Sequence, residues 1–220
     1  MNPEPNSWWD WEHAIAVFPD LLLQGFKITL VATVLGTLIA LVLGLIVAII
    51  RRSTPPIINA PVTWIVEFIR MTPLVVQLVF ANLVLSPYFD SSLAIGIWVL
   101  GIHYTTYMAE VYRAGIDSVP KGQWEAATAL SLPRLRTWRA VVVPQAIRNT
   151  LPALGNYAIS MFKETPFFVV IYIPELVRVA QNYGSTYFRY TEAITLAGLI
   201  FLAASYPTSL LIRKLEKKLA

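Results

Sequence analysis

The sequence predicts an all-α, polytopic membrane protein with five transmembrane helices, and three observations support this class. Hydrophobic residues make up 56% of the chain and charged residues only 14%, whereas charged residues make up about a quarter of an ordinary soluble domain. The mean hydropathy is positive, at +0.60. The stretch 28–50 carries no charge and exceeds the roughly 20 apolar residues that cross a hydrocarbon core.

Residues 1–25 predict an extracytoplasmic segment that lies at the membrane interface. Tryptophan favours the headgroup level of a bilayer, and this segment contains Trp8, Trp9 and Trp11. It has no lysine or arginine, so it lacks the basic start of a signal peptide. Its acidic residues are Glu4, Asp10, Glu12 and Asp20.

A transmembrane domain is predicted over residues 26–213, followed by a basic cytoplasmic tail over 214–220. Arg51 and Arg52 end the first span, and a mostly polar loop over 175–190 precedes the fifth. The five predicted spans are 28–50, 62–85, 92–109, 147–173 and 193–212.

The distribution of basic residues predicts the orientation. Five spans place the two ends of the chain on opposite sides of the membrane. With the amino terminus outside, twelve of the 17 lysines and arginines fall on one side, which the positive-inside rule assigns to the cytoplasm. They are Arg51, Arg52, Arg113, Lys121, Arg134, Arg136, Arg139, Arg148, Arg213, Lys214, Lys217 and Lys218.

Residues 121–144, KGQWEAATALSLPRLRTWRAVVVP, predict two short helices with a break between them; we call this stretch the elbow. Ser131-Leu132-Pro133 ends the first helix, because a residue before proline is pushed out of the helical region. On the second helix one face carries Leu135, Trp138 and Val142, and the other carries Arg136 and Arg139. The periodicity alone fits equally an interfacial loop whose arginines contact lipid headgroups.

Residue identity in the elbow resembles the EAA loop of ATP-binding-cassette (ABC) importer permeases. Glu125, Ala126 and Ala127 match its first three residues, and Ser131 and Pro144 follow at its fixed spacing. From residue 110 to 166 the chain is similar to polar amino acid permeases, and within them to permeases for ectoine-type compatible solutes. Two residues depart from the pattern, Ser131 for glycine and Val143 for leucine. Serine replaces a glycine readily only where no left-handed backbone is needed.

The resemblance implies a permease subunit in a bacterial cytoplasmic (inner) membrane that is not itself an enzyme. Its expected partners are ABC ATPase subunits, a second permease copy or related chain, an extracytoplasmic solute-binding protein and membrane lipid. ATP is expected on the ATPase, since this sequence has no phosphate-binding loop, and no cofactor is expected here. The implied ATPase-docking residues are Glu125, Ala126, Ala127, Ser131 and Pro144.

Two similar charged stretches interrupt predicted spans and are candidates for the translocation path. They share a basic-x-Thr-Pro pattern, and each proline removes a helical hydrogen bond. A charge at mid-membrane costs roughly 2.5 to 3.5 kcal/mol, so these charges should face a cavity or pair structurally. We expect them to meet a zwitterionic solute. The residues are Glu67, Arg70, Thr72 and Pro73, and Lys163, Glu164, Thr165 and Pro166.

Other classes are less well supported by the residues present. The chain has no cysteine, and His13 and His103 lie far apart, so no metal site is expected. The basic residues follow the topology rather than one soluble face, which argues against nucleic acid as a partner. No catalytic motif points to an intramembrane enzyme. The main alternative is a secondary transporter or channel that is not coupled to ATP.

Overall fold

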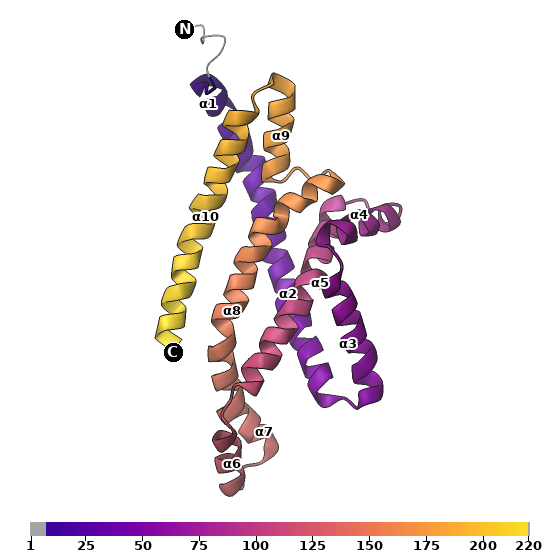
Figure 1. Cartoon of the computed structure of the whole chain (residues 1–220), viewed down its shortest axis with the longest axis vertical. Coiled ribbons are helices and arrows are strands. Elements are labelled where there is room, and N and C mark those ends of the chain that lie inside the picture. The colour runs from indigo at the N-terminus through magenta and orange to yellow at the C-terminus, as the bar shows by residue number, and fades with distance from the viewer. Residues whose placement is uncertain (1–7, 220) are drawn as a thin grey trace. The chain divides into compact units, whose positions relative to one another are not determined.

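The computed structural model describes residues 8–219, and every regular element in that range is a helix (Figure 1). Two π-helical turns, Leu21–Phe26 and Trp138–Val142, and a 3₁₀ helix, Thr165–Ile171, accompany the α-helices. The predicted all-α class is confirmed. The α-helices are α1 (Trp11–Asp20), α2 (Lys27–Ser53), α3 (Pro56–Met71), α4 (Leu74–Leu85), α5 (Ser92–Asp117), α6 (Lys121–Ala129), α7 (Arg134–Thr137), α8 (Val143–Glu164), α9 (Leu176–Tyr187) and α10 (Tyr190–Leu219).

The chain divides into two compact units, and each long helix α2, α5, α8 and α10 contributes residues to both. The first unit consists of Met1–Gly36, of which residues 8–36 are described, Pro73–Leu100 and Ser160–Thr208. The second consists of Thr37–Thr72, Gly101–Ile159 and the described part of Ser209–Ala220.

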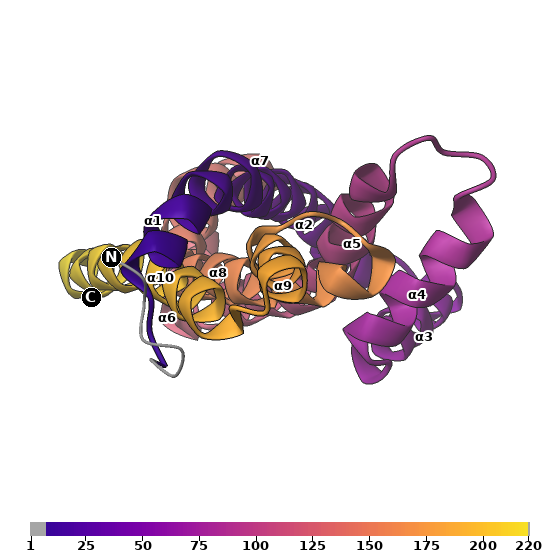
Figure 2. The same ribbon diagram turned by 90° about the horizontal axis from the view of Figure 1, so that it is seen from above.

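In the first unit, α9 packs against α1, against the π-helical turn Leu21–Phe26 and against α10 (Figures 1 and 2). A Cβ on Gly25 would lie 2.8 Å from the Cα of Leu176, so only glycine permits this approach. The Leu176 N–H donates to the Thr29 hydroxyl at 3.3 Å. The buried cluster that these helices share is Val17, Leu21, Leu176, Val179, Ala180, Ala193, Ala197 and Ile200.

The polar loop predicted over 175–190 is wrong, because most of it forms α9. Glu175 caps this helix, and its side chain accepts hydrogen bonds from the N–H groups of Val177 and Arg178 at 2.9 and 2.7 Å. Burial raises the pKa of the Glu175 carboxyl to about 7, against the lowering effect of these two hydrogen bonds. Leu176, Val179, Ala180 and Tyr183 recur at the i, i+3, i+4 and i+7 spacing of an amphipathic helix, so the sequence carried a helix signal that the prediction did not use.

At the amino-terminal end, helix continues without a break from Trp11 to Ser53. Residues 1–7, including Glu4, lie outside the described part, as does Ala220. Asp10 caps α1 by accepting from the Glu12 N–H at 2.8 Å. The predicted boundary at residue 25 therefore falls inside a helical run rather than at its end. Trp8 and Trp11 are mostly exposed, and the interfacial position of this segment stays a prediction.

Two helices are long and apolar enough to cross a membrane by length and composition, Trp11–Ser53 and Tyr190–Lys218. A third is obtained if α3 and α4 are counted as one broken span. The second predicted span, 62–85, is thus not one kinked helix: α3 starts earlier, at Pro56, and ends at Met71, and α4 follows Pro73. Five spans remain a prediction.

The second unit holds the elbow and the helices that support it. A Cβ on Gly115 of α5 would lie 2.1 Å from the Thr150 Cγ2 and 3.1 Å from the Ala146 carbonyl oxygen of α8. Glycine therefore lets α5 and α8 approach closely at the point where the elbow leaves them. The adjacent buried cluster consists of Val119, Val142 and Ala146.

Candidate functional site

The elbow has the predicted form of two short helices, α6 and α7, joined by a break. The break is a Schellman motif: the Leu132 N–H donates to the Ala127 carbonyl at 3.0 Å and the Ser131 N–H to the Thr128 carbonyl at 2.9 Å. Ser131 holds the left-handed position of this motif, with φ of 51°. The sequence left the geometry of this turn open, and the structure shows that serine replaces glycine here although the position is left-handed.

The elbow exposes Glu125 and Ala126 and buries Ala127. Ala127 lies on the inner side of α6, where the ring of Trp124 meets that of Trp138 edge to face with centroids 5.3 Å apart. Of the EAA residues, two are thus available to a partner and the third packs inside the elbow. Ser131 and Pro144 are also exposed.

The predicted apolar face of the second elbow helix holds only in part. Val142 is buried and Trp138 partly buried, but Leu135 is 65% exposed. Pro144 has no N–H to donate within the helix, and the Val143 N–H bonds to the Trp138 carbonyl in a π-helical turn. The extra residue in this turn rotates Val142 away from the face of Leu135. Arg136 and Arg139 are exposed, as predicted.

A charged network ties the ends of α2 and α5 to the elbow. Arg51 pairs with Glu110, and Arg113 donates to the other Glu110 oxygen at 2.7 Å. Arg52 pairs with Asp117 at 2.5 Å, and its guanidinium lies 5.8 Å from the ring centroid of Trp138 in the elbow. Arg52 therefore joins the elbow to α2 directly and to α5 through Asp117.

Glu110 is the centre of this network. Burial acts to raise the pKa of its carboxyl, but the hydrogen bonds and charges of Arg113 and Arg51 outweigh burial and lower it. Glu110 is therefore held as a carboxylate between two guanidinium groups. Sequence reasoning used Arg51 and Arg52 as the end of a span and as part of the orientation signal, and it missed the network. The i, i+3 and i, i+7 spacing of Glu110, Arg113 and Asp117 was the available signal.

The two basic-x-Thr-Pro stretches solve the same backbone problem in the same way. Pro73 cannot donate to the Ile69 carbonyl, and the Thr72 hydroxyl donates to it instead at 3.0 Å. Pro166 likewise cannot donate to the Phe162 carbonyl, and the Thr165 hydroxyl donates to it at 2.9 Å. Both threonines therefore have a structural role at a helix end.

The charges of the two stretches differ in their surroundings. In the second unit, Arg70 pairs with Glu67 at 3.1 Å, and each side chain is about one-third exposed, at 33% and 32%. In the first unit, Lys163 is exposed and Glu164 partly exposed. Neither makes an ion pair with another described residue. The first pair fits the structural interpretation, whereas the second pair shows no such ion pair among the described residues.

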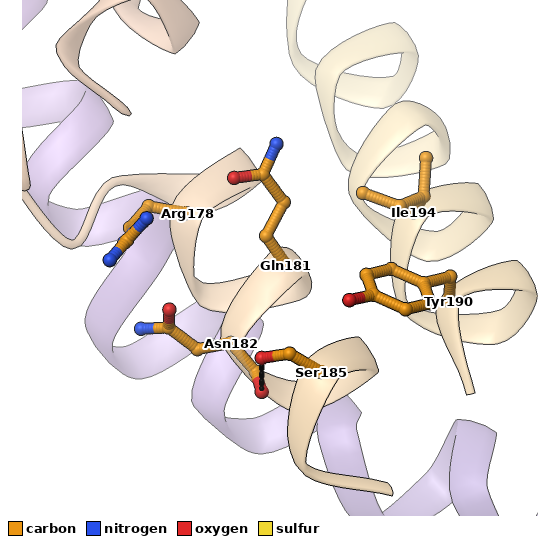
Figure 3. A pocket seen from close by; sticks show the side chains of 6 residues that line it. All are labelled: Arg178, Gln181, Asn182, Ser185, Tyr190 and Ile194. Atoms are coloured by element: carbon orange, nitrogen blue, oxygen red, sulfur yellow. Dashed lines mark hydrogen bonds between the residues drawn. The ribbon is translucent and has the colours of Figure 1, made fainter. Parts of the chain in front are cut away.

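Sequence reasoning missed a polar pocket of about 580 Å³ between α9 and α10 (Figure 3). Within the described residues, no group of three or more acidic, histidine or cysteine side chains could hold a metal ion. The pocket is lined by Arg178, Gln181, Asn182, Ser185, Tyr190 and Ile194.

An all-helical, mostly apolar chain that exposes a two-helix elbow braced by charged helix ends defines a helical membrane transport component. The chain belongs to the family described as the binding-protein-dependent transport system inner membrane component, whose model matches residues 23–220. The predicted family is thereby confirmed.

Relatives and solved structures agree with this family. The chain is 40% identical to the probable amino-acid ABC transporter permease protein y4tG of Sinorhizobium fredii, over 94% of this chain and 90% of that protein. It is 34% identical to the glutamine transport system permease protein GlnP of Escherichia coli, over 96% and 97%. A crystal structure of an amino acid ABC transporter with histidines matches with a TM-score of 0.89 and 33% identity, over 96% and 99% of the two chains. The MetNI methionine ABC transporter, 20% identical with a TM-score of 0.78, over 91% and 96%, shows the same fold.

Ser131→Gly should increase the free energy of unfolding by about 0.5 to 1 kcal/mol, because glycine adopts the left-handed backbone without a Cβ clash. The measurement is the thermal unfolding midpoint of the purified protein in detergent. Ser205→Gly, inside α10, is the control and should lower the midpoint. A midpoint that falls for Ser131→Gly would contradict the left-handed assignment.

Arg52→Ala should loosen the elbow, because it removes both the Asp117 ion pair and the contact with the Trp138 ring. Each is worth about 0.5 to 1 kcal/mol at a partly exposed site, so amide hydrogen exchange over residues 121–144 should speed up several-fold. Arg52→Lys, which keeps the charge but loses the planar contact, should lie between. Arg213→Ala on α10 is the control and should leave exchange over residues 121–144 unchanged. If Arg52→Ala exchanged as slowly as the unchanged protein, the bracing role would be disproved.

Proposed function

We propose that this chain is the permease subunit of an ABC importer and forms the translocation path for a polar amino acid, with ATP hydrolysed by a separate subunit. The observation that carries the proposal is the exposed Glu125–Ala126 edge of an elbow braced against α2 and α5. The names of the relatives, which transport amino acids including glutamine, support the solute class.

In the proposed mechanism the ATPase contacts the elbow at Glu125 and Ala126. Glu125 supplies a polar contact, and the small Ala126 permits close approach of a partner helix. Ala127 is buried and holds the spacing to Trp138. Ser131 and Pro144 shape the elbow through the left-handed turn and the π-helical turn. Closing of the ATPase then moves the elbow, and the Arg52 contacts pass the movement to α2 and α5.

The proposed assembly contains two permease chains, identical or related, two ATPase subunits and an extracytoplasmic binding protein. We place it in a bacterial inner membrane, with the amino terminus outside and the carboxyl terminus in the cytoplasm. The basic residues on the elbow and in the tail support this orientation. A pore formed by two chains also explains why helices of one chain expose so many large apolar side chains.

For the translocation path we propose that Lys163 and Glu164 contact the solute. A zwitterion carries separated charges and needs a partner of each sign in a site away from bulk water. Lys163 would meet the carboxylate and Glu164 the ammonium group. Glu67 and Arg70 satisfy one another, so in this proposal they line the path without leaving a charge for the solute.

The first test is uptake of labelled glutamine, arginine and ectoine by cells that express this chain with its ATPase, binding protein and any partner permease. Glu125→Arg should abolish uptake while ATP hydrolysis by the assembled complex continues, because the reversed charge disrupts docking at an exposed position. Glu216→Arg, the same exposed reversal on α10, is the control and should leave uptake unchanged.

If neither Glu125→Arg nor ATP depletion changed uptake, the proposal would be wrong, and the chain would be a secondary transporter or channel that is not coupled to ATP. Uptake of ectoine but not of the amino acids would assign the chain to the compatible-solute branch that its sequence resembles.

Lys163→Met should reduce uptake at least tenfold while the assembled complex is recovered in unchanged yield, because an exposed, unpaired lysine supports no neighbour that its loss would disturb. Uptake and gel-filtration yield are measured together. Lys27→Met, another exposed lysine of the first unit, is the matched control. Loss of assembly with Lys163→Met would favour a structural role over a solute contact.

A further inference from the structure

Four aromatic rings of the second unit form one cluster, which we call the aromatic wall: His103, Tyr104 and Tyr107 on α5 and Tyr157 on α8. The ring centroids of Tyr107 and Tyr157 lie 5.5 Å apart. The Tyr104 ring lies 5.8 Å from that of Tyr107 and 6.2 Å from that of Tyr157. The His103 ring lies 5.4 Å from the Tyr107 ring. The wall therefore joins α5 and α8 through ring contacts.

Burial divides the wall into an inner and an outer pair of rings. His103 is 7% exposed and Tyr104 only 3%, so these two rings are packed within the unit. Tyr107 and Tyr157 are each partly exposed. The inner rings thus hold the outer rings in place, and the outer rings present part of their surface beyond the contact between the two helices.

The helix segments that carry the wall offer a ligand little besides ring surface. Residues 92–109 of α5 and 149–162 of α8 include no charged residue. The hydroxyls of Thr105 and Thr106 donate to carbonyl groups of their own helix, at 2.8 and 2.7 Å. A ligand at the wall therefore meets the faces of Tyr107 and Tyr157 rather than a charged side chain or a threonine hydroxyl.

The acidic residue that follows the wall on α5 does not change this conclusion. Glu110 comes three residues after Tyr107, but it is paired with Arg51 and Arg113. Its negative charge is thus already matched within the protein. Attraction of a cation to the wall must therefore come from the rings.

The face of an aromatic ring is negative and attracts a cation that lies within about 6 Å of its centroid, most strongly where water is excluded. A guanidinium is planar, delocalised and weakly hydrated, and it stacks on aromatic faces, whereas a primary ammonium is a compact and strongly hydrated charge. An amidinium shares the planar, delocalised form. A wall of rings without a carboxylate therefore favours a planar, delocalised cation over an ammonium group.

The spacing along α8 relates the wall to the proposed solute contact. Tyr157 precedes Glu164, the proposed partner of the positive group of the solute, by seven residues of this helix. Residues at i and i+7 lie on one side of a helix. The exposed ring of the wall and the acidic residue thus share a side of α8.

We propose that the aromatic wall is a selectivity element for the transported solute, favouring amino acids with a guanidinium or an amidinium group that stacks on the exposed rings of Tyr107 and Tyr157. This rests on the proposed function, because the rings meet a solute only if the chain forms its path. Arginine carries a guanidinium and ectoine an amidinium, whereas glutamine carries neither.

The test measures uptake of labelled arginine, ectoine and glutamine by the complete importer in proteoliposomes. The unaltered importer should take up arginine or ectoine. Tyr157→Leu, which replaces the ring by an aliphatic side chain, should lower that uptake about tenfold, while any uptake of glutamine falls less than about twofold. Because the binding protein is the same in every sample, such a difference between solutes comes from the permease. Tyr112→Leu, at a partly exposed tyrosine of α5 outside the wall, is the control and should leave uptake of each solute unchanged.

A series of rings at position 157 separates attraction of a cation from packing. Tyr157→Phe keeps the ring and should keep uptake of the cationic solute. Trifluorinated phenylalanine at the same position keeps the shape and the apolar character, but fluorine withdraws negative charge from the ring face. Uptake should therefore fall several-fold from phenylalanine to its trifluorinated form, with an unchanged yield of assembled importer.

Three results would overturn the proposal. They are uptake of glutamine alone among the three solutes, unchanged uptake of arginine and ectoine in Tyr157→Leu, and equal uptake with phenylalanine and its trifluorinated form at position 157. The last of these would assign the ring to packing. A failure of the proposed importer function is seen differently, as uptake that depends neither on ATP nor on Glu125, whichever solute is carried.

Discussion

A proline in a helix leaves one carbonyl without its N–H partner, and in an apolar membrane environment that carbonyl must be satisfied within the protein. Much of this structure follows from how the chain meets that constraint. At Pro73 the helix ends, and at Pro166 the α-helix α8 passes directly into the 3₁₀ helix Thr165–Ile171; in both places the threonine before the proline donates its hydroxyl to the carbonyl that the proline cannot reach. At Pro144 the helix continues, with a π-helical turn immediately before it. The threonine hydrogen bond thus accompanies a break or a change of helix type, whereas the π-helical turn joins the elbow to α8.

The effect of proline on the backbone made the break in the elbow predictable from sequence, but it did not predict how the second span is divided. Leu132-Pro133 predicted the break between α6 and α7 correctly, because the restriction on a residue before proline is local. The same local rule at Thr72-Pro73 predicted a kink, but the structure has two separate helices there. Whether a helix resumes in line depends on what packs around it, which sequence spacing does not show. Helix α9 was missed although its apolar residues have amphipathic helical spacing; what the sequence did not show is the surface that receives Leu176, since Gly25 and Thr29 lie far away in the sequence.

In the candidate site too, the sequence predicted local features and did not predict those that depend on contacts in the folded chain. Residue identity was sufficient to single out Glu125 and Ala126, which the structure shows to be exposed. It was not sufficient to separate Glu67 and Arg70, which satisfy each other at 3.1 Å, from Lys163 and Glu164, which have no ion-pair partner among the described residues. The shared Thr-Pro pattern made the two stretches look functionally equivalent. The structure shows that the two stretches share the threonine hydrogen bond to the backbone but differ in the ion pairing of their charges.

Left-handed backbone conformations mark the ends of three helices in this structure. Among the described residues, the non-glycine residues with a left-handed backbone are Ser131, Tyr172 and Phe188. One shapes the elbow, and the other two bracket α9. Each costs stability that a glycine would largely recover, and each holds an exposed side chain or turn in a fixed position at the end of a short helix. Packing in the core gains nothing from these conformations, since all three residues are exposed. The simplest physical account is that each residue ends a helix: at Ser131 and at Tyr172 the same pair of Schellman hydrogen bonds satisfies the last carbonyls of the helix, and Phe188 is the C-cap of α9.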